Sequence, residues 1–289
     1  MKKENNKGLL VSLVLLSGAL FMSGCNHIVL FNPKGPVADR EISLIILAFA
    51  FMLIVVVPVF IMAIWFSIKY RESNTKSTYK PRWANSTKIE WAIWMVPVLI
   101  VILLSYHTWS KTHQLDPYKP LDFPGKEIQI EVVSMDWGWL FIYPDYDMAT
   151  VNELVFQVNT PLSFKLTSST VMTSFFIPQL GSQMYAMAGM QTRLHLMAEE
   201  TGTFEGQNQE FSGKGYENMH FRVIAATPEE FRKWVNKVKT SSETLSIARY
   251  NELSMPNLNY AVTYYSSVDS DLFQYILSKY MGGYGANSK

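Results

Sequence analysis

One apolar run, residues 42–68, constrains the fold of this chain more than any other feature. It consists almost wholly of Leu, Ile, Val, Phe, Ala and Met. As a helix it would rise about 40 Å, which is enough to cross a bilayer with some tilt. The run has no polar face, which argues against the alternative of a buried helix in a soluble core. Pro58 lies inside it, a position that membrane helices tolerate.

A second apolar stretch, residues 89–109, predicts a second membrane span, which Pro97 should kink. The loop between the spans, residues 69–88, carries six basic residues and one acid. By the positive-inside rule this loop lies in the cytoplasm, so the segment 25–41 and everything after the second span lie outside. The 48% hydrophobic and 17% charged composition agrees with a membrane chain. A net charge of +1 gives no basic surplus for nucleic acid.

The N-terminus, residues 1–24, reads as a signal peptide. Three lysines precede a short apolar stretch, and Met22-Ser23-Gly24-Cys25 follows. This ending resembles the bacterial lipobox, which implies cleavage and lipidation at Cys25, with acyl chains in the outer leaflet. Met22 departs from the usual leucine there. The alternative is a buried or free thiol beside an uncleaved anchor.

From residue 126 the pattern changes to short apolar runs separated by prolines and glycines, which predict strands. The expected strands are 128–133, 140–143, 154–158, 163–167, 174–177, 193–197 and 220–224. Seven or more strands in about 100 residues predict a β-sandwich or barrel over 126–226. Residues 227–289 predict a helical extension, with one helix capped by Thr227 and another over 271–280.

Two spans followed by such a domain, with MDWGW at 135–139 and SFFIP at 174–178, resemble subunit 2 of haem–copper respiratory oxidases. The likeness includes segments 180–197 and 206–219 and covers essentially the whole mature chain. It implies a two-helix transmembrane hairpin followed by an all-β cupredoxin-like sandwich and a short C-terminal helical extension.

The branch of that family that oxidises cytochrome c binds a dinuclear copper centre in this domain. Its ligands are two cysteines, a glutamate backbone carbonyl, two histidines and a methionine, the soft and imidazole donors that copper requires. At the matching positions this chain retains only the glutamate and the methionine. The six positions are Thr173, Asn208, Glu210, Ser212, Tyr216 and Met219. We therefore expect no metal here.

Two other patterns could suggest a metal. His195 and His220 lie near the altered segments, but neither matches a family ligand position, so both are expected to be structural. The irregularly spaced methionines between residues 184 and 197 favour core packing over copper binding. Trp137 matches the residue through which electrons enter in the cytochrome c branch, and here it is expected to serve packing.

Loss of the copper ligands resembles the quinol branch, most closely the cytochrome bo-type ubiquinol oxidases. The resemblance implies a proton-pumping terminal oxidase whose haems, single copper and ubiquinol are bound by subunit 1. This chain is then expected to hold no cofactor and no catalytic group. Its expected partners are subunits 1, 3 and 4 and membrane lipid, with no docking of cytochrome c, in the bacterial inner membrane. The alternatives are a cytochrome c oxidase subunit 2 and a free-standing lipoprotein with a degenerate cupredoxin domain.

Glu90 lies where the second span begins on the cytoplasmic side. From position alone it fits a helix-start residue that interacts with the helix dipole, or a proton relay. The family has a glutamate seven residues before a proline, at the mouth of a proton channel into subunit 1. Glu90 and Pro97 reproduce that spacing, so the resemblance favours proton entry.

Overall fold

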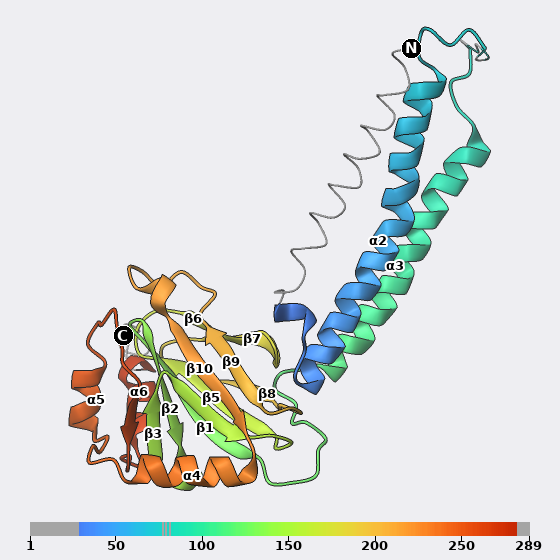
Figure 1. Cartoon of the computed structure of the whole chain (residues 1–289). Helices are drawn as coiled ribbons and strands as arrows, with labels where there is room; N and C mark the ends of the chain where they lie inside the picture. Colours follow the sequence, from blue (N-terminus) through green and yellow to red (C-terminus); the bar gives the residue numbers. More distant parts are fainter. Residues whose placement is uncertain (1–28, 77, 79, 81, 282–289) are drawn as a thin grey trace, which may run out of the picture. The chain divides into compact units, whose positions relative to one another are not determined.

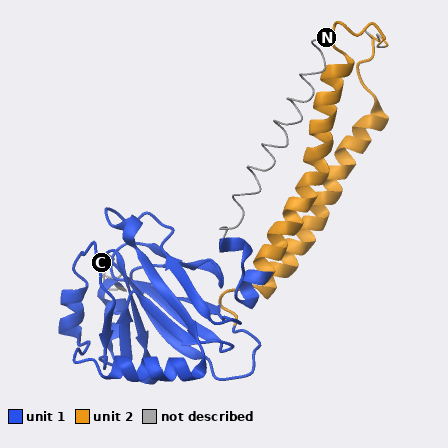
Figure 2. Cartoon of the chain, viewed as in Figure 1, with its two compact units in different colours: residues 1–39, 120–289 blue, residues 40–119 orange. Residues whose placement is uncertain are grey.

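The computed structural model describes residues 29–281 except positions 77, 79 and 81. The chain divides into two compact units, residues 1–39 with 120–289, and residues 40–119 (Figure 2). Each unit is described by itself below. The expected signal peptide 1–24 and Cys25 lie outside the described residues.

Two long helices, α2 (Pro36–Lys69) and α3 (Thr87–Gln114), account for most of the second unit (Figure 1). Both are long and apolar enough to cross a membrane, and no side chain in their most apolar windows is buried. Large apolar side chains left in water carry a free-energy cost of about 25 cal/mol per Å². These surfaces therefore fit lipid or a partner protein, as in a membrane-anchored subunit. Both helices continue beyond the expected spans 42–68 and 89–109.

The first unit is built on two packed β-sheets. Sheet A has the strand order β11-β3-β2-β1-β5-β8, and sheet B has the order β4-β10-β9-β6-β7. Parallel pairing of β1 with β5 and of β10 with β4 brings segments far apart in the sequence together. The strands are β1 (Ile128–Met135), β2 (Gly138–Tyr143), β3 (Met148–Val151), β4 (Glu153–Gln157), β5 (Leu162–Ser168), β6 (Thr173–Ile177), β7 (Gly181–Ala186), β8 (Thr192–Leu196), β9 (Gly202–Gln207), β10 (His220–Ala226) and β11 (Thr263–Tyr265).

The main core lies between the two sheets and is rich in aromatic rings. Phe175 and Phe221 stack with centroids 5.2 Å apart, and Trp139 meets Phe175 edge-on at 5.5 Å. Such offset and edge-to-face pairs stabilise a core beyond the area they bury. The Nε1 of Trp139 has no hydrogen-bond partner among the described residues, and the edge-on geometry is suited to an N–H contact with a ring.

A second core lies on the other face of sheet A, under the C-terminal extension. Val133, Leu140 and Val151 from the sheet pack with residues of helices α5 (Ile247–Leu253) and α6 (Leu272–Met281). Because sheet A is covered on both faces, all six residues of β2 are buried. The alternation typical of a half-exposed strand is therefore absent in β2.

The predicted sandwich is confirmed, and each expected strand overlaps a strand of the structure. Four strands were not predicted: β3, β7, β9 and β11. The structure separates β3 from β4 at Asn152, whose φ of +55° turns the chain between the two short strands. The strands β7 and β9 carry glycines and polar residues, and β11 has only three residues, so their patterns were too weak to detect.

The predicted cap of the first C-terminal helix, α4 (Pro228–Lys239), is confirmed. Thr227 accepts a hydrogen bond from the backbone N–H of Glu230, and the Glu230 carboxylate accepts one from the backbone N–H of Thr227. This reciprocal arrangement satisfies two N–H groups that a helix start leaves free. Hydrogen bonds from Thr227 lower the pKa of the Glu230 carboxyl.

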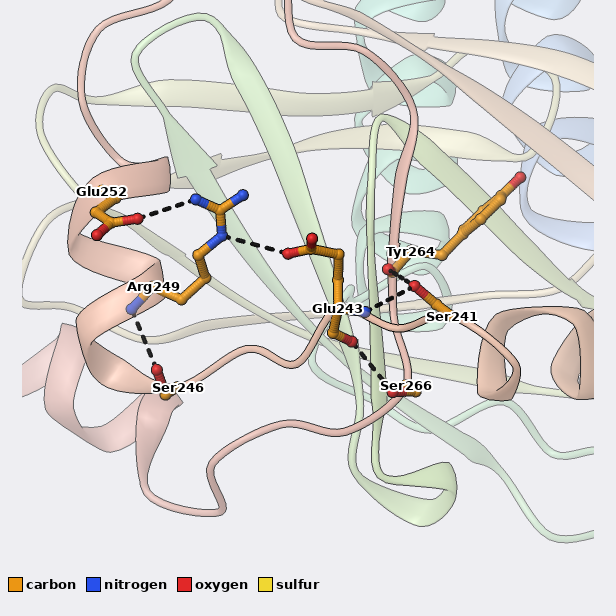
Figure 3. Close-up of polar contacts among 7 residues, drawn as sticks. All are labelled: Ser241, Glu243, Ser246, Arg249, Glu252, Tyr264 and Ser266. Carbon is orange, nitrogen blue, oxygen red and sulfur yellow. Dashed lines mark hydrogen bonds and ion pairs between the residues drawn. The ribbon is translucent and has the colours of Figure 1, made fainter.

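Beyond α4 the extension is held together by short polar contacts (Figure 3). Arg249 lies between two carboxylates, 2.9 Å from Glu252 and 3.6 Å from Glu243. The Oγ of Ser241 donates to the carbonyl of Tyr264 at 2.7 Å. The ion pairs are half exposed, so each contributes little to stability. The buried apolar contacts with sheet A contribute more.

A buried carboxylate, Glu153 at the start of β4, joins the extension to the sandwich. It is 5% exposed. Its Oε1 accepts hydrogen bonds from Trp234 Nε1 of α4 at 3.2 Å and from the Tyr264 hydroxyl of β11 at 2.6 Å. The guanidinium of Arg222 lies 3.8 Å from its other oxygen. Burial, with the bond to Glu153, raises the pKa of Tyr264 to about 12.

We expect Glu153→Ala to lower the free energy of unfolding of the domain by about 2–4 kcal/mol, because two partly buried donors lose their acceptor. Thermal or urea unfolding of the full chain in detergent measures this. The matched control is Glu205→Ala, whose side chain is 71% exposed and pairs with His220; it should cost less than about 1 kcal/mol. Equal losses in the two variants would contradict the role of Glu153.

Candidate functional site

The positions that the family resemblance assigns to copper ligands lie together at one end of the sandwich. They come from the start of β6 and from the loop between β9 and β10, which contains the 3₁₀ turn Tyr216–Asn218. The turn between β1 and β2, residues 136–137, borders them. Side-chain hydrogen bonds join the start of β6, the loop between β9 and β10 and the turn between β1 and β2 into one site.

The amide of Asn208 is the centre of this cluster and is 5% exposed. Its Oδ1 accepts hydrogen bonds from the backbone N–H groups of Ser174 and Glu210, each at 2.9 Å. Its Nδ2 lies within bonding distance of the Glu210 carbonyl at 2.7 Å, the Ser212 hydroxyl at 3.1 Å and the Met219 sulfur at 3.3 Å. Two N–H groups thus share three acceptors. One neutral side chain connects β6, the loop and Met219.

This donor set does not fit a dinuclear copper centre. Such a centre needs bridging thiolates and imidazoles, whereas the cluster offers an amide, hydroxyls and one thioether. The amide oxygen and nitrogen of Asn208 are already engaged, and the Ser212 hydroxyl donates to the Met219 sulfur at 3.7 Å. Among the residues that the structure describes, no three His, Cys, Asp or Glu side chains gather in a way that could hold a metal ion.

The other two altered positions make their contacts with other residues. Thr173 is buried, and its hydroxyl donates to the Ser134 hydroxyl of β1 at 2.7 Å. Tyr216 belongs to the 3₁₀ turn, and its ring lies 5.9 Å from that of the exposed Phe211. The sequence did not reveal Ser134 and Ser174 as polar partners of these positions. No motif marks such partners, because they are distant in the sequence.

Trp137 packs against the same loop. Its Nε1 donates to the Ser212 carbonyl at 2.9 Å, and its own backbone is left-handed with φ of +75°. A Cβ at Gly215 would lie 2.3 Å from Trp137 Cγ, so only glycine allows this close approach. The indole therefore fixes the loop from outside while Asn208 fixes it from within.

The two histidines near the altered segments lie on different sheets. His195 of β8 is buried, and its Nε2 lies 3.2 Å from the Ser163 hydroxyl. His220 of β10 pairs with the Glu205 carboxylate at 2.9 Å. Each imidazole has a polar neighbour on an adjacent strand, as a structural histidine does.

Glu90 lies in the first turn of α3, where its backbone N–H donates to the Ser86 carbonyl at 3.0 Å. Its side chain is exposed on the isolated chain. Pro97 lies inside the same helix.

Two family models match this sequence. Residues 100–226 match the cytochrome c oxidase subunit II periplasmic domain, and residues 239–284 match the COX aromatic rich motif. A solved structure of the periplasmic domain of subunit II of cytochrome oxidase from Bradyrhizobium japonicum is also similar. It has 25% sequence identity and a TM-score of 0.38, and the match covers 39% of this chain and 94% of that one.

Curated relatives match nearly the whole sequence. Cytochrome bo(3) ubiquinol oxidase subunit 2 of Pseudomonas aeruginosa is 51% identical over 92% of this chain and 80% of its own length. Ubiquinol oxidase subunit 2 of Acetobacter aceti is 47% identical over 93% and 87%. Quinol oxidase subunit 2 of Bacillus subtilis is 36% identical over 90% and 83%. This chain therefore belongs to the subunit 2 family of the quinol oxidases.

Proposed function

We propose that this chain is subunit 2 of a proton-pumping terminal oxidase that transfers electrons from ubiquinol to oxygen in the aerobic respiratory chain. The observation that carries the proposal is the 51% identity over 92% of the chain to a ubiquinol oxidase subunit 2. The relatives at 47–51% identity are named as ubiquinol oxidase subunits, which supports ubiquinol as the donor. The complex is placed in the bacterial inner membrane with the β domain on the outer side.

In this complex the chain serves assembly and stability and carries no catalytic group of its own. Ubiquinol delivers electrons from within the membrane. Electrons therefore do not need to pass through a copper centre in the external domain. The amide cluster around Asn208 supports this role, because hydrogen bonds hold the loop that metal ligands would otherwise hold. The haems, a single copper and ubiquinol are assigned to subunit 1. Subunits 3 and 4 and membrane lipid complete the set of proposed partners.

The competing functions make different predictions. A cytochrome c oxidase subunit 2 would need copper ligands that the site lacks. A free-standing lipoprotein would need no partner, whereas the relatives at 36–51% identity are named as subunits of quinol oxidases. The quinol oxidase assignment accounts for both the altered loop and these relatives.

Purification through a tag on this chain tests the assignment. We expect mild detergent to yield a stable complex with a haem-bearing subunit that consumes oxygen with ubiquinol and not with reduced cytochrome c. Electron paramagnetic resonance should show no mixed-valence copper pair. A chain that runs alone, or oxygen uptake driven by cytochrome c, would contradict the proposal.

The second part of the proposal concerns Glu90 as a proton-entry carboxylate. Its exposed side chain in the first turn of α3 is available to a partner subunit. A helix-start residue would instead act through the dipole, which contributes about 0.3–1 kcal/mol to helix stability. The two roles are separable, because only the first affects turnover in a fully assembled complex.

We expect Glu90→Ala to slow proton-coupled reduction of oxygen severalfold per assembled complex, while Glu90→Asp retains most of it. Stopped-flow oxidation of the reduced complex and proton uptake measure the effect. Glu72→Ala, which removes the one acid of the loop 69–88, is the matched control and should leave turnover unchanged. Normal turnover in assembled Glu90→Ala would show that Glu90 has only a helix-start role.

For the N-terminus we propose cleavage before Cys25 and attachment of a diacylglyceryl group to its thiol. Intact-mass measurement of the purified chain should show a mature N-terminus at Cys25 with an added acylglycerol mass. In Cys25→Ser that added mass should be lost, because the hydroxyl does not replace the thioether. An unmodified chain beginning at Met1 would refute both cleavage and lipidation.

A further inference from the structure

A short turn at the N-terminal edge of the first unit presents three large apolar side chains together. Val29, Leu30 and Phe31 form a 3₁₀ turn closed by the hydrogen bond from Asn32 N–H to the Val29 carbonyl at 3.1 Å. Their exposed fractions are 50%, 39% and 54%. Single exposed apolar residues are normal on a surface, but three consecutive ones that no other described residue covers indicate an interaction site. We name this group the apolar turn.

The residues after the apolar turn are fastened to the sandwich. The Lys34 N–H donates to the Gln179 carbonyl at 2.7 Å, and the Lys34 carbonyl accepts from Glu199 N–H at 2.9 Å. The Lys34 ammonium also pairs with the Glu200 carboxylate. A Cβ at Gly35 would lie 2.1 Å from the Met197 carbonyl oxygen, so the backbone lies flat on the sheet edge. The apolar turn is therefore presented from a fixed base.

The distance along the chain places the apolar turn near the membrane surface. Only four residues separate Phe31 from Pro36, where the first membrane-capable helix begins, and the five steps of chain between them span at most about 17 Å. Pro36 and the apolar turn belong to the same compact unit. Charged residues Asp39, Arg40 and Glu41 then mark the interfacial end of the helix before its apolar run. The apolar turn thus lies within reach of the headgroup region.

We propose that Val29, Leu30 and Phe31 insert into the outer leaflet. The occupant of this surface is lipid, because the turn lies four residues before the first membrane-capable helix and its three side chains carry no charge. Burial of apolar side chains at the headgroup boundary is how interfacial segments bind membranes. The inference rests on the membrane location proposed above. It does not require lipidation of Cys25, which lies four residues before Val29.

Spin labels measure the depth of the apolar turn. We expect a nitroxide on Leu30→Cys or Phe31→Cys to collide often with oxygen and rarely with a soluble nickel chelate. The sample is the purified complex in vesicles of phosphatidylethanolamine and phosphatidylglycerol. Met255→Cys is the matched control, since Met255 is also apolar and is 64% exposed in the C-terminal extension. The ratio of oxygen to nickel collisions should be severalfold higher at positions 30 and 31 than at 255.

Each alternative has its own outcome. Nickel collisions at positions 30 and 31 equal to those at 255 would place the turn in water and overturn the proposal. Protection from both oxygen and nickel would show that another subunit covers the turn, which also overturns the proposal.

Cys25 is the one cysteine in the sequence, so labelling of the parent chain reports a free thiol there. That result would refute lipidation, and the depth measurement would proceed in Cys25→Ser.

Discussion

Both faces of sheet A are apolar, and the rest of the domain is arranged to cover them. Sheet B covers one face through the aromatic core around Phe175 and Phe221. The C-terminal extension covers the other through α5 and α6. An extension that lies on an apolar sheet must also be held in register, and the buried Glu153 carboxylate does this by accepting hydrogen bonds from α4 and β11. The extension is therefore a layer of the fold.

The cluster around Asn208 holds its loop with hydrogen bonds of one neutral side chain. A neutral amide provides both donors and acceptors, so it can join several backbone groups at once without the desolvation cost of burying a charge. Trp137 and the glycines of the loop supply the outer packing. These contacts hold the loop with neutral side chains alone.

The strongest sequence patterns predicted their structures correctly. The span 42–68 is apolar on all sides, and strands such as 128–133 and 220–224 show clear runs between turns. The break at Asn152 was not predictable, since it depends on a left-handed residue whose amide bonds Trp139 N–H and the Tyr260 carbonyl. For the site, the resemblance gave the positions, but the bond from Ser174 to Asn208 depends on strand pairing across 34 residues. No pattern in the sequence near either residue indicates this hydrogen bond.

The three-residue strand β11 has a consequence for the order in which the domain can be completed during synthesis. It pairs with β3 and occupies the outer edge of sheet A. Residues 263–265 leave the ribosome after every other strand, so the edge of β3 stays open until nearly the whole chain has been made. An open edge is a template for pairing with another chain. A nascent or truncated chain that lacks this last strand therefore leaves the edge of β3 unpaired, and it also lacks α6, which packs on the outer face of sheet A.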